Sequence, residues 1–239
     1  IDPDQNILNN QVRCRYYSPN SFYKEKVRLN HLNSTECSFS IFHNNIRSLR
    51  KNVENLHTHV LEELDYSFSV IGITETRITS DTELNFNYHL PGYVFEYVAT
   101  PLAAGGVGMY IRNDFNYYII EKTSKEAFQA LWIEIILPEK KNILCGVLYR
   151  QHNSPECFTK YLNDKLELFS AKGNPVFIFG DTNIDILRIN NCNYAHNFLT
   201  SLQSFSMLPT IDKPTRVHRD SATLIDNIFI NNVSDLVLS

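Results

Sequence analysis

Several features are missing from this sequence of 239 residues, and each absence excludes a class of protein. No apolar run reaches about 18 residues, so the sequence predicts no membrane-spanning helix. The net charge is −4, whereas proteins that hold nucleic acid mainly by electrostatic attraction are usually basic. A purely electrostatic nucleic-acid binder is therefore disfavoured. A metal-dependent enzyme that cleaves phosphodiesters stays possible, because a metal ion neutralises its acidic ligands.

The sequence also lacks the usual patterns of zinc and disulfide proteins. Its five cysteines are scattered, with no CxxC pair, and its eight histidines include no HExxH motif. We predict free thiols in a reducing compartment. The chain begins with Ile and shows no signal-peptide pattern. We therefore expect it to be a fragment or a processed piece of a longer protein.

The composition is that of a globular protein, with 43% hydrophobic and 20% charged residues. No internal repeat and no long linker rich in Pro, Gly or Ser interrupts it. Residues 1–36 are polar and without a clear period, which predicts a loosely structured lead-in. Residues 37–239 are predicted to form one domain.

Helical and strand patterns are mixed along this domain. Apolar residues at helical spacing predict helices over about 51–64, 155–169 and 198–205. Alternating or continuously apolar runs predict strands over 38–43, 68–74, 93–97, 106–112, 131–137, 143–149, 175–180 and 224–230. Many strands with few helices predict a layered α+β or α/β sandwich.

Polar residues follow or close several of these apolar strands. Glu75 follows one, Asp181 follows another, and Asp226 lies inside the last. A carboxylate directly after a buried strand is costly unless it is paired or bound to a metal. Each one alone also fits a helix cap or a turn. The three are far apart in the sequence, so only the fold can bring them together.

The glycines at 105, 106 and 108 are spaced like part of a dinucleotide-binding loop. They precede a predicted strand rather than a helix, so we interpret Gly105 and Gly106 as a turn and not as a phosphate cradle.

An ordered set of segments resembles a known family. The segments are HNNIRSLRKN, VIGITETRI, GGVGMYIRND, LYRQHNSP, IFGDTNID and KPTRV…SATLIDNIF. They resemble the endonuclease/exonuclease/phosphatase superfamily, and most of all the apurinic-type endonuclease domain of non-LTR (LINE-type) retrotransposon polyproteins. This resemblance implies an α+β fold of four α/β/β/α layers, in which two mixed β-sheets pack face to face with helices outside.

The resemblance also implies roles for particular residues. Glu75 matches the metal-binding glutamate, and Asn45 matches the asparagine beside the metal. The expected metal is Mg²⁺, and Mn²⁺ is expected to be able to replace it. Asp181 matches the aspartate that positions or deprotonates the attacking water. Tyr149 and Asn183 match residues that contact the scissile phosphate. Asp226 matches the aspartate that orients the catalytic histidine. Further substrate contacts are assigned to Asn153 and Arg216.

The activity implied is nicking of double-stranded DNA at a retrotransposon target site, leaving a 3′-hydroxyl that primes reverse transcription. A reverse transcriptase domain is then expected downstream in the same polyprotein, and the expected location is the nucleus, with assembly in the cytoplasm. Two alternatives remain: a phosphatase acting on a small phosphoester or phosphoinositide, and a degenerate, non-catalytic DNA-binding fragment. The PTR…TLIDNIF ending argues against the phosphatase.

The family's final motif is Ser-Asp-His on a strand that follows Asp226, and its histidine has no counterpart here, since the last histidine is His218. Ser234-Asp235-Leu236 provides two letters of the motif but follows Asp226 too soon to lie on a new strand. We therefore expect the last strand and the motif to lie beyond Ser239, which would leave the chain as given catalytically impaired. The rival interpretation is decay of the histidine to Leu236.

Overall fold

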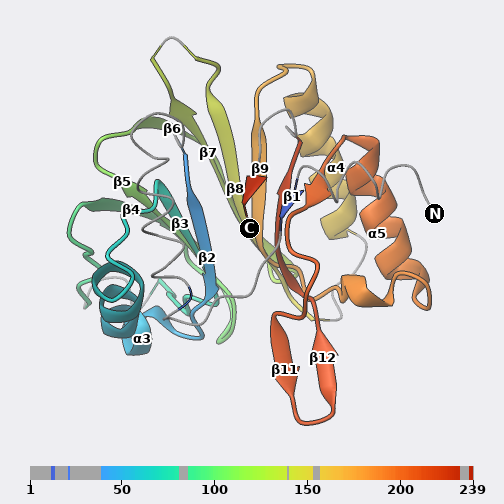
Figure 1. Ribbon diagram of the computed structural model, residues 1–239, viewed down its shortest axis with the longest axis horizontal. Helices are drawn as coiled ribbons and strands as arrows, with labels where there is room; N and C mark the ends of the chain where they lie inside the picture. The colour runs from blue at the N-terminus through green and yellow to red at the C-terminus, as the bar shows by residue number, and fades with distance from the viewer. Residues whose placement is uncertain are drawn as a thin grey trace.

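The structure is a computed structural model that describes residues 12–13, 21, 39–80, 86–138, 140–152, 157–231 and 237–238. Two β-sheets pack face to face, and helices cover their outer faces (Figure 1). This arrangement confirms the four-layer α/β/β/α sandwich. The division into a lead-in and one domain stays a prediction, because almost all of residues 1–36 lies outside the described residues.

The smaller sheet has four strands. In spatial order they are β2 (Ile41–Asn45), β3 (Val70–Thr74), β5 (Val107–Arg112) and β4 (Tyr93–Val98). Strands β2 and β3 are parallel, and the other pairs are antiparallel. All five residues of β3 are buried, as its continuous apolar run predicted.

The larger sheet has six strands, of which β8 and β9 are parallel neighbours and the others pair antiparallel. In spatial order they are β10 (Leu208–Pro209), β13 (Asp226–Ile230), β9 (Val176–Asp181), β8 (Ile143–Arg150), β7 (Phe128–Ile136) and β6 (Asn116–Ser124). The sequence did not predict β6. It is an edge strand with little burial, and a bulge between Ile119 and Glu121 breaks its alternation.

Helices cover both outer faces. Helix α3 (Leu49–Leu56) continues into a π-helical segment, η1 (His57–Glu62), and their apolar side packs on the smaller sheet. Helices α4 (Cys157–Ser170) and α5 (Asn193–Ser204) pack on the larger sheet (Figure 1). A short 3₁₀ turn, η2 (Ile186–Arg188), precedes α5. No helix in the described ranges has the length and apolarity needed to cross a bilayer.

The inner faces of the two sheets form a continuous apolar core. Phe179 of β9 is fully buried in it and lies against Gly72 of β3. A side chain at position 72 would collide with the ring of Phe179. The absence of a side chain at Gly72 therefore allows the sheets to approach closely at this point.

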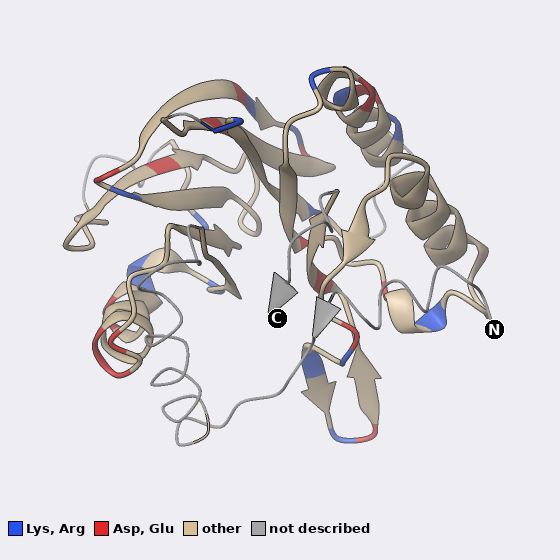
Figure 2. Ribbon diagram, turned by 45° about the horizontal axis from the view of Figure 1, so that its top comes forward, with Lys and Arg blue, Asp and Glu red and all other residues tan. Residues whose placement is uncertain are grey.

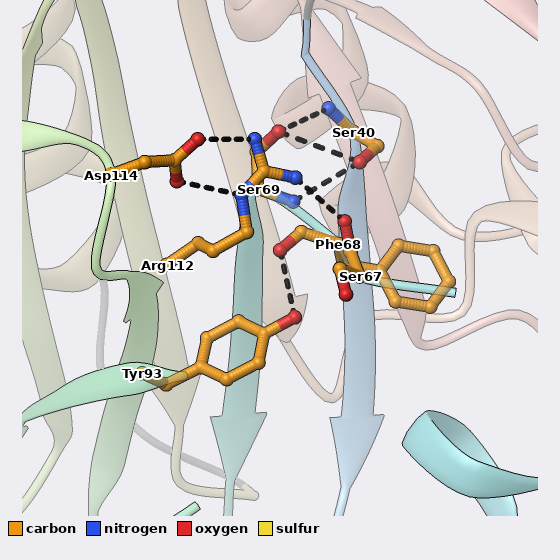
Figure 3. Close-up of polar contacts among 7 residues, drawn as sticks. All are labelled: Ser40, Ser67, Phe68, Ser69, Tyr93, Arg112 and Asp114. Atoms are coloured by element: carbon orange, nitrogen blue, oxygen red, sulfur yellow. Dashed lines mark hydrogen bonds and ion pairs between the residues drawn. The ribbon is translucent and has the colours of Figure 1, made fainter. Parts of the chain in front are cut away.

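Hydrogen bonds between side chains and backbone connect the starts of β2 and β3 in the smaller sheet. The Ser40 and Ser69 backbone amides each donate to the other residue's hydroxyl, at 3.0 and 3.1 Å (Figure 3). Beside them, Arg112 is paired with Asp114, with Nε 2.6 Å from Oδ1. The opposite end of β3 leads directly into Glu75, so these contacts lie at the end away from the polar residues predicted to be functional.

A hairpin of β11 (Arg216–His218) and β12 (Ser221–Thr223) projects from the body of the sandwich (Figure 1). The sequence did not predict it. Strands β1 (Val12–Arg13) and β14 (Val237–Leu238) form a parallel pair. Of the five cysteines, Cys145, Cys157 and Cys192 are free thiols, and Cys14 and Cys37 lie outside the described residues.

Candidate active site

The strand directions bring the predicted site residues to one end of the sandwich. Parallel strands β2 and β3 lead into Asn45 and Glu75, while β8 and β9 end beyond Tyr149 and at Asp181. Strand β13 runs the other way and begins with Asp226, directly opposite Asp181. Residues far apart in the sequence therefore meet because each occupies the same end of its strand.

Four polar residues form a row across the larger sheet. Gln129 is paired in register with Tyr149, Tyr149 with Asp181, and Asp181 with Asp226, on the neighbouring strands β7, β8, β9 and β13. In-register residues share a face of a sheet. This face packs on the smaller sheet, because Tyr149 belongs to the core between the sheets.

Asn45 joins the two sheets at this end. Its side-chain amide donates to Glu75 Oε1 at 2.9 Å and to Asp181 Oδ2 at 2.8 Å. The amide oxygen of Asn45 is buried and has no hydrogen-bond partner among the described residues. Both hydrogens of the amide thus hold carboxylates, and its oxygen remains available to a ligand.

The backbone at the site is strained. Glu75 (φ 52°), Arg77 (φ 55°) and Asn183 (φ 50°) all have left-handed backbone angles, which are uncommon for residues other than glycine. Local hydrogen bonds hold them. The Ser48 amide donates to the Glu75 carbonyl at 2.8 Å, and the Asn183 amide donates to Asp181 Oδ1 at 2.9 Å. Such strain is often concentrated at functional sites.

Burial and crowding of carboxylates make Asp181 and Asp226 unusually basic. Burial, with the charge of Asp226 next, raises the pKa of Asp181 from 3.8 to about 7, although hydrogen bonds from Asn183 and Asn45 oppose the rise. Burial likewise raises the pKa of Asp226 to about 6, opposed by a hydrogen bond from Thr215. Near neutral pH, Asp181 can therefore exchange a proton readily.

Tyr149 keeps its proton at neutral pH. Burial, together with the charges of Glu75 and Asp181, raises the pKa of its hydroxyl to about 12. That hydroxyl donates to Gln151 Oε1 at 3.3 Å. Asn183 turns its amide toward the same strand, donating from Nδ2 to the Arg150 carbonyl at 2.8 Å. Both side chains are hydrogen-bond donors beside the acidic residues.

Asp226 contacts the base of the hairpin. Thr215 donates from its hydroxyl to Asp226 Oδ2 at 3.1 Å, while Asp226 Oδ1 is buried and has no partner in the described part of the chain. Arg216 is exposed on β11, and its charge opposes the rise in the pKa of Asp226 that burial causes. Asn153, the other predicted substrate contact, lies outside the described residues.

The family model described as "Endonuclease/Exonuclease/phosphatase family" matches residues 30–235. The chain belongs to this family. No curated protein sequence matches it significantly.

Solved structures share the fold of this endonuclease/exonuclease/phosphatase chain at low sequence identity. The endonuclease domain of TRAS1, a telomere-specific non-LTR retrotransposon, is 11% identical with a TM-score of 0.56, over 80% of this chain and 83% of that one. The Xenopus laevis APE2 catalytic domain is 17% identical with a TM-score of 0.62, over 82% and 84%. The AP endonuclease LMAP from Leishmania major is 12% identical with a TM-score of 0.65, over 97% and 87%.

The donor atoms at this family member's site fit Mg²⁺. The described residues contain no cluster of three or more His, Cys, Asp or Glu side chains that would enclose a metal. However, Mg²⁺ prefers hard oxygen ligands, keeps several waters and often uses only one or two carboxylates. The carboxylate of Glu75 and the unpartnered amide oxygen of Asn45 supply such ligands. A cation would also offset the repulsion among the carboxylates of Glu75, Asp181 and Asp226, of which Glu75 is already paired with Arg77 at 3.4 Å.

Three residues beside the site were not predicted. Arg150 is 5% exposed, donates to the Thr182 carbonyl at 3.3 Å and lies over the ring of Tyr194, so it supports the turn after β9 from the helix side. Thr215 and Gln129 also contact the site region. Arg150 could have been found from the sequence, because it is a charged residue at the end of an apolar strand. Gln129 could not, because it lies inside an otherwise apolar strand.

Proposed function

We propose that this chain is a Mg²⁺-dependent DNA endonuclease domain of the retrotransposon type, which nicks one strand of double-stranded DNA and leaves a 3′-hydroxyl for reverse transcription. The observation that carries the proposal is the direct hydrogen bonding of Asn45 to both Glu75 and Asp181 across the two sheets. Membership of the endonuclease/exonuclease/phosphatase family supports phosphoester hydrolysis. The fold shared with the TRAS1 endonuclease domain supports DNA as the substrate.

Glu75 and Asn45 are the residues that would hold the metal. When bound, Mg²⁺ would supply positive charge to the phosphoryl oxygens during hydrolysis. The remaining contributions come from this chain's own side chains.

Asp181 is suited to accept a proton from the attacking water. In the metal-free protein, burial and the charge of Asp226 raise its pKa to about 7, so this carboxylate binds a proton more readily than an ordinary aspartate does. The Asn183 amide holds Asp181 Oδ1 and the Asn45 amide holds Oδ2, so the carboxylate has a fixed orientation. Fixed orientation reduces the entropic cost of bringing the water into line.

Tyr149 and Asn183 are suited to bind the phosphate. The Tyr149 hydroxyl stays protonated at neutral pH and can turn its single hydrogen from Gln151 to a phosphate oxygen, while Asn183 has a second amide hydrogen beyond the one given to Arg150. Donors already in place for the charge that develops on the phosphoryl oxygens lower the barrier. Asp226 Oδ1 can accept one more donor, in keeping with its expected role of orienting a histidine.

The hairpin β11–β12 beside the site favours an extended substrate over a small one. Arg216, His218, Ser221 and Thr223 line an open depression of about 280 Å³ on one face of β11–β12. Figure 2 shows basic residues at the base and the tip of this hairpin, with acidic residues beside them. The PTR…TLIDNIF segment forms both the hairpin and the strand that carries Asp226. In this proposal the segment therefore contacts DNA next to the site. Asn153 and Arg216 are proposed substrate contacts.

The proposal includes a reverse transcriptase domain in the same polyprotein and a nuclear site of action. These follow from the resemblance to retrotransposon endonuclease domains.

A plasmid-nicking assay tests the proposal. In Mg²⁺, supercoiled plasmid is expected to become nicked circles whose ends a DNA polymerase extends directly, at the reduced rate expected for the chain as given. Asp181→Asn is expected to slow nicking by about 100-fold or more, as loss of acid–base assistance usually does. Glu75→Gln is also expected to slow nicking, because it removes a carboxylate ligand of the metal. Glu134→Gln is the matched control, because Glu134 is a partly buried carboxylate on β7 bound by Asn142 at 2.9 Å. Hydrolysis of a small phosphoester or phosphoinositide without nicking would favour the phosphatase instead.

A further inference from the structure

Gln129 is the fourth member of the polar row across the larger sheet, and the proposed mechanism gives it no task. The other members of the row are Tyr149, which is its direct neighbour, Asp181 and Asp226. The next residues of β7 on the same face, Leu131, Ile133 and Ile135, are all apolar core residues. A buried amide in such a position is costly unless its hydrogen bonds are satisfied.

Both ends of the Gln129 amide are satisfied, and one bond reaches the other sheet. Gln129 is 1% exposed. Its Oε1 accepts from the Gly106 backbone amide at 3.0 Å, and its Nε2 donates to the Lys125 carbonyl at 2.5 Å. Gly106 precedes β5 of the smaller sheet, whereas Lys125 lies in the turn before β7 of the larger sheet. Gln129 therefore links the two sheets at the end where the site lies.

The hydrogen bond from the smaller sheet to Gln129 comes from the Gly105–Gly106 turn. Both residues have positive φ, 103° and 84°. A Cβ on Gly105 would lie 2.5 Å from Gln129 Oε1 and 3.1 Å from the Tyr149 ring, and one on Gly106 would collide with Thr76. The paired glycines thus allow the turn to fit between the glutamine and the segment that follows β3.

The same turn holds the segment that carries Glu75. The Arg77 amide donates to the Gly105 carbonyl at 2.9 Å, and the Thr76 amide donates to the Gly106 carbonyl at 3.3 Å. Glu75 and Arg77 themselves have left-handed backbone angles, so this segment depends on its neighbours to keep its shape. A continuous set of hydrogen bonds therefore connects Gln129 to the backbone on the C-terminal side of Glu75.

We propose that Gln129 is a positioning residue for the metal ligand Glu75, acting through the Gly105–Gly106 turn. This inference rests on the proposed metal-binding role of Glu75. Residues that orient a metal ligand typically contribute about 10- to 100-fold to metal affinity. Both polar ends of Gln129 are bonded to backbone groups, so its removal is expected to weaken metal binding by letting the Glu75 segment relax.

The test is direct Mn²⁺ binding, measured by titration calorimetry without DNA, for wild type, Glu75→Gln, Gln129→Met, Gln129→Glu and Ser69→Ala. Gln129→Met keeps the size of the side chain but removes both hydrogen bonds. Gln129→Glu keeps an acceptor for Gly106 and, when protonated, also a donor for Lys125. Ser69→Ala is the matched control, because Ser69 is 2% exposed and links β2 to β3 at the other end of the smaller sheet (Figure 3).

The Kd for Mn²⁺ is expected to rise about 10-fold in Gln129→Met, to rise less in Gln129→Glu, and to stay at the wild-type value in Ser69→Ala. Should Gln129→Met not fold, Gln129→Asn takes its place, since its amide is one methylene too short to reach Gly106. Wild-type affinity in a folded variant that lacks the Gly106 bond would overturn the inference and leave the proposed function standing. Absence of Glu75-dependent Mn²⁺ binding in the wild type would overturn both.

Discussion

Replacing Asp181 by Asn is expected to stabilise the metal-free protein while it removes activity. The folded state holds the Asp181 carboxyl in a buried place beside Asp226 and Glu75, and the pKa rises from 3.8 to about 7. Folding therefore opposes ionisation of this group. Asparagine has nearly the same shape and still offers an oxygen to the Asn183 amide, but it has no charge to bury.

The sign and the size of the effect follow from these two pKa values. Between about pH 4 and pH 7 the folded protein keeps a proton at Asp181 that the unfolded chain has released. Stability contributed by this group is therefore complete at low pH and is lost as the pH rises through this range. Each pKa unit corresponds to about 1.4 kcal/mol, so the wild type loses up to about 4 kcal/mol, and Asp181→Asn escapes this loss.

Urea unfolding in EDTA at a series of pH values between 4 and 8 measures the effect. Trp132 is the only tryptophan and is fully buried, so its fluorescence reports unfolding. The variant is expected to gain on the wild type steadily as the pH rises. Asp114→Asn is the control of opposite sign, because its hydrogen bond with Arg112 lowers the pKa of Asp114, and that stabilisation is lost only as the pH falls. Parallel curves for wild type and Asp181→Asn would refute the reasoning.

Three further predictions concern binding and catalysis. Glu75→Gln is expected to raise the Kd for Mn²⁺ in calorimetry by at least about 10-fold, and an unchanged Kd would remove Glu75 from the metal site. Arg216→Ala is expected to weaken DNA binding and to reduce the slope of log affinity against log salt by about 1 in fluorescence anisotropy, whereas Lys172→Ala, an exposed cation just after α4, is expected to keep the slope. Imidazole is expected to speed plasmid nicking by offering a donor to the unpartnered Asp226 Oδ1, and stimulation that persists in Asp226→Asn would contradict this.

The sequence predicted most of the buried framework. The uninterrupted apolar run ending at Thr74 and the one ending at Gly180 appear as buried strands, because strands covered on both faces need no polar positions. Strand β6 was not predicted, since its bulge breaks the alternation and its side chains are largely exposed. The short hairpin β11–β12 was not predicted either, because three-residue strands carry too little pattern.

The candidate site was predictable only in part. A carboxylate after an apolar strand marked Glu75 and Asp181 in the sequence, the family resemblance marked Asn45, and the fold brings the three together. The roles assigned to them stay predictions. The sequence did not single out Gln129, because it is one amide inside an apolar strand. Its position beside the site follows only from the strand register that pairs it with Tyr149. Such cross-strand relations depend on the whole sheet.

The contact between Gly72 and Phe179 has a consequence for how the site can evolve. Asn45 and Glu75 belong to the smaller sheet and Asp181 to the larger one, so the distance between the sheets sets the distance between the carboxylates. Phe179 lies two residues before Asp181, and Gly72 lies three before Glu75. A larger residue at position 72 would separate the sheets and widen the site without touching any of its polar groups. We therefore expect substitutions in the core between the sheets, and not only those at the polar residues, to change the size of substrate that the site accepts.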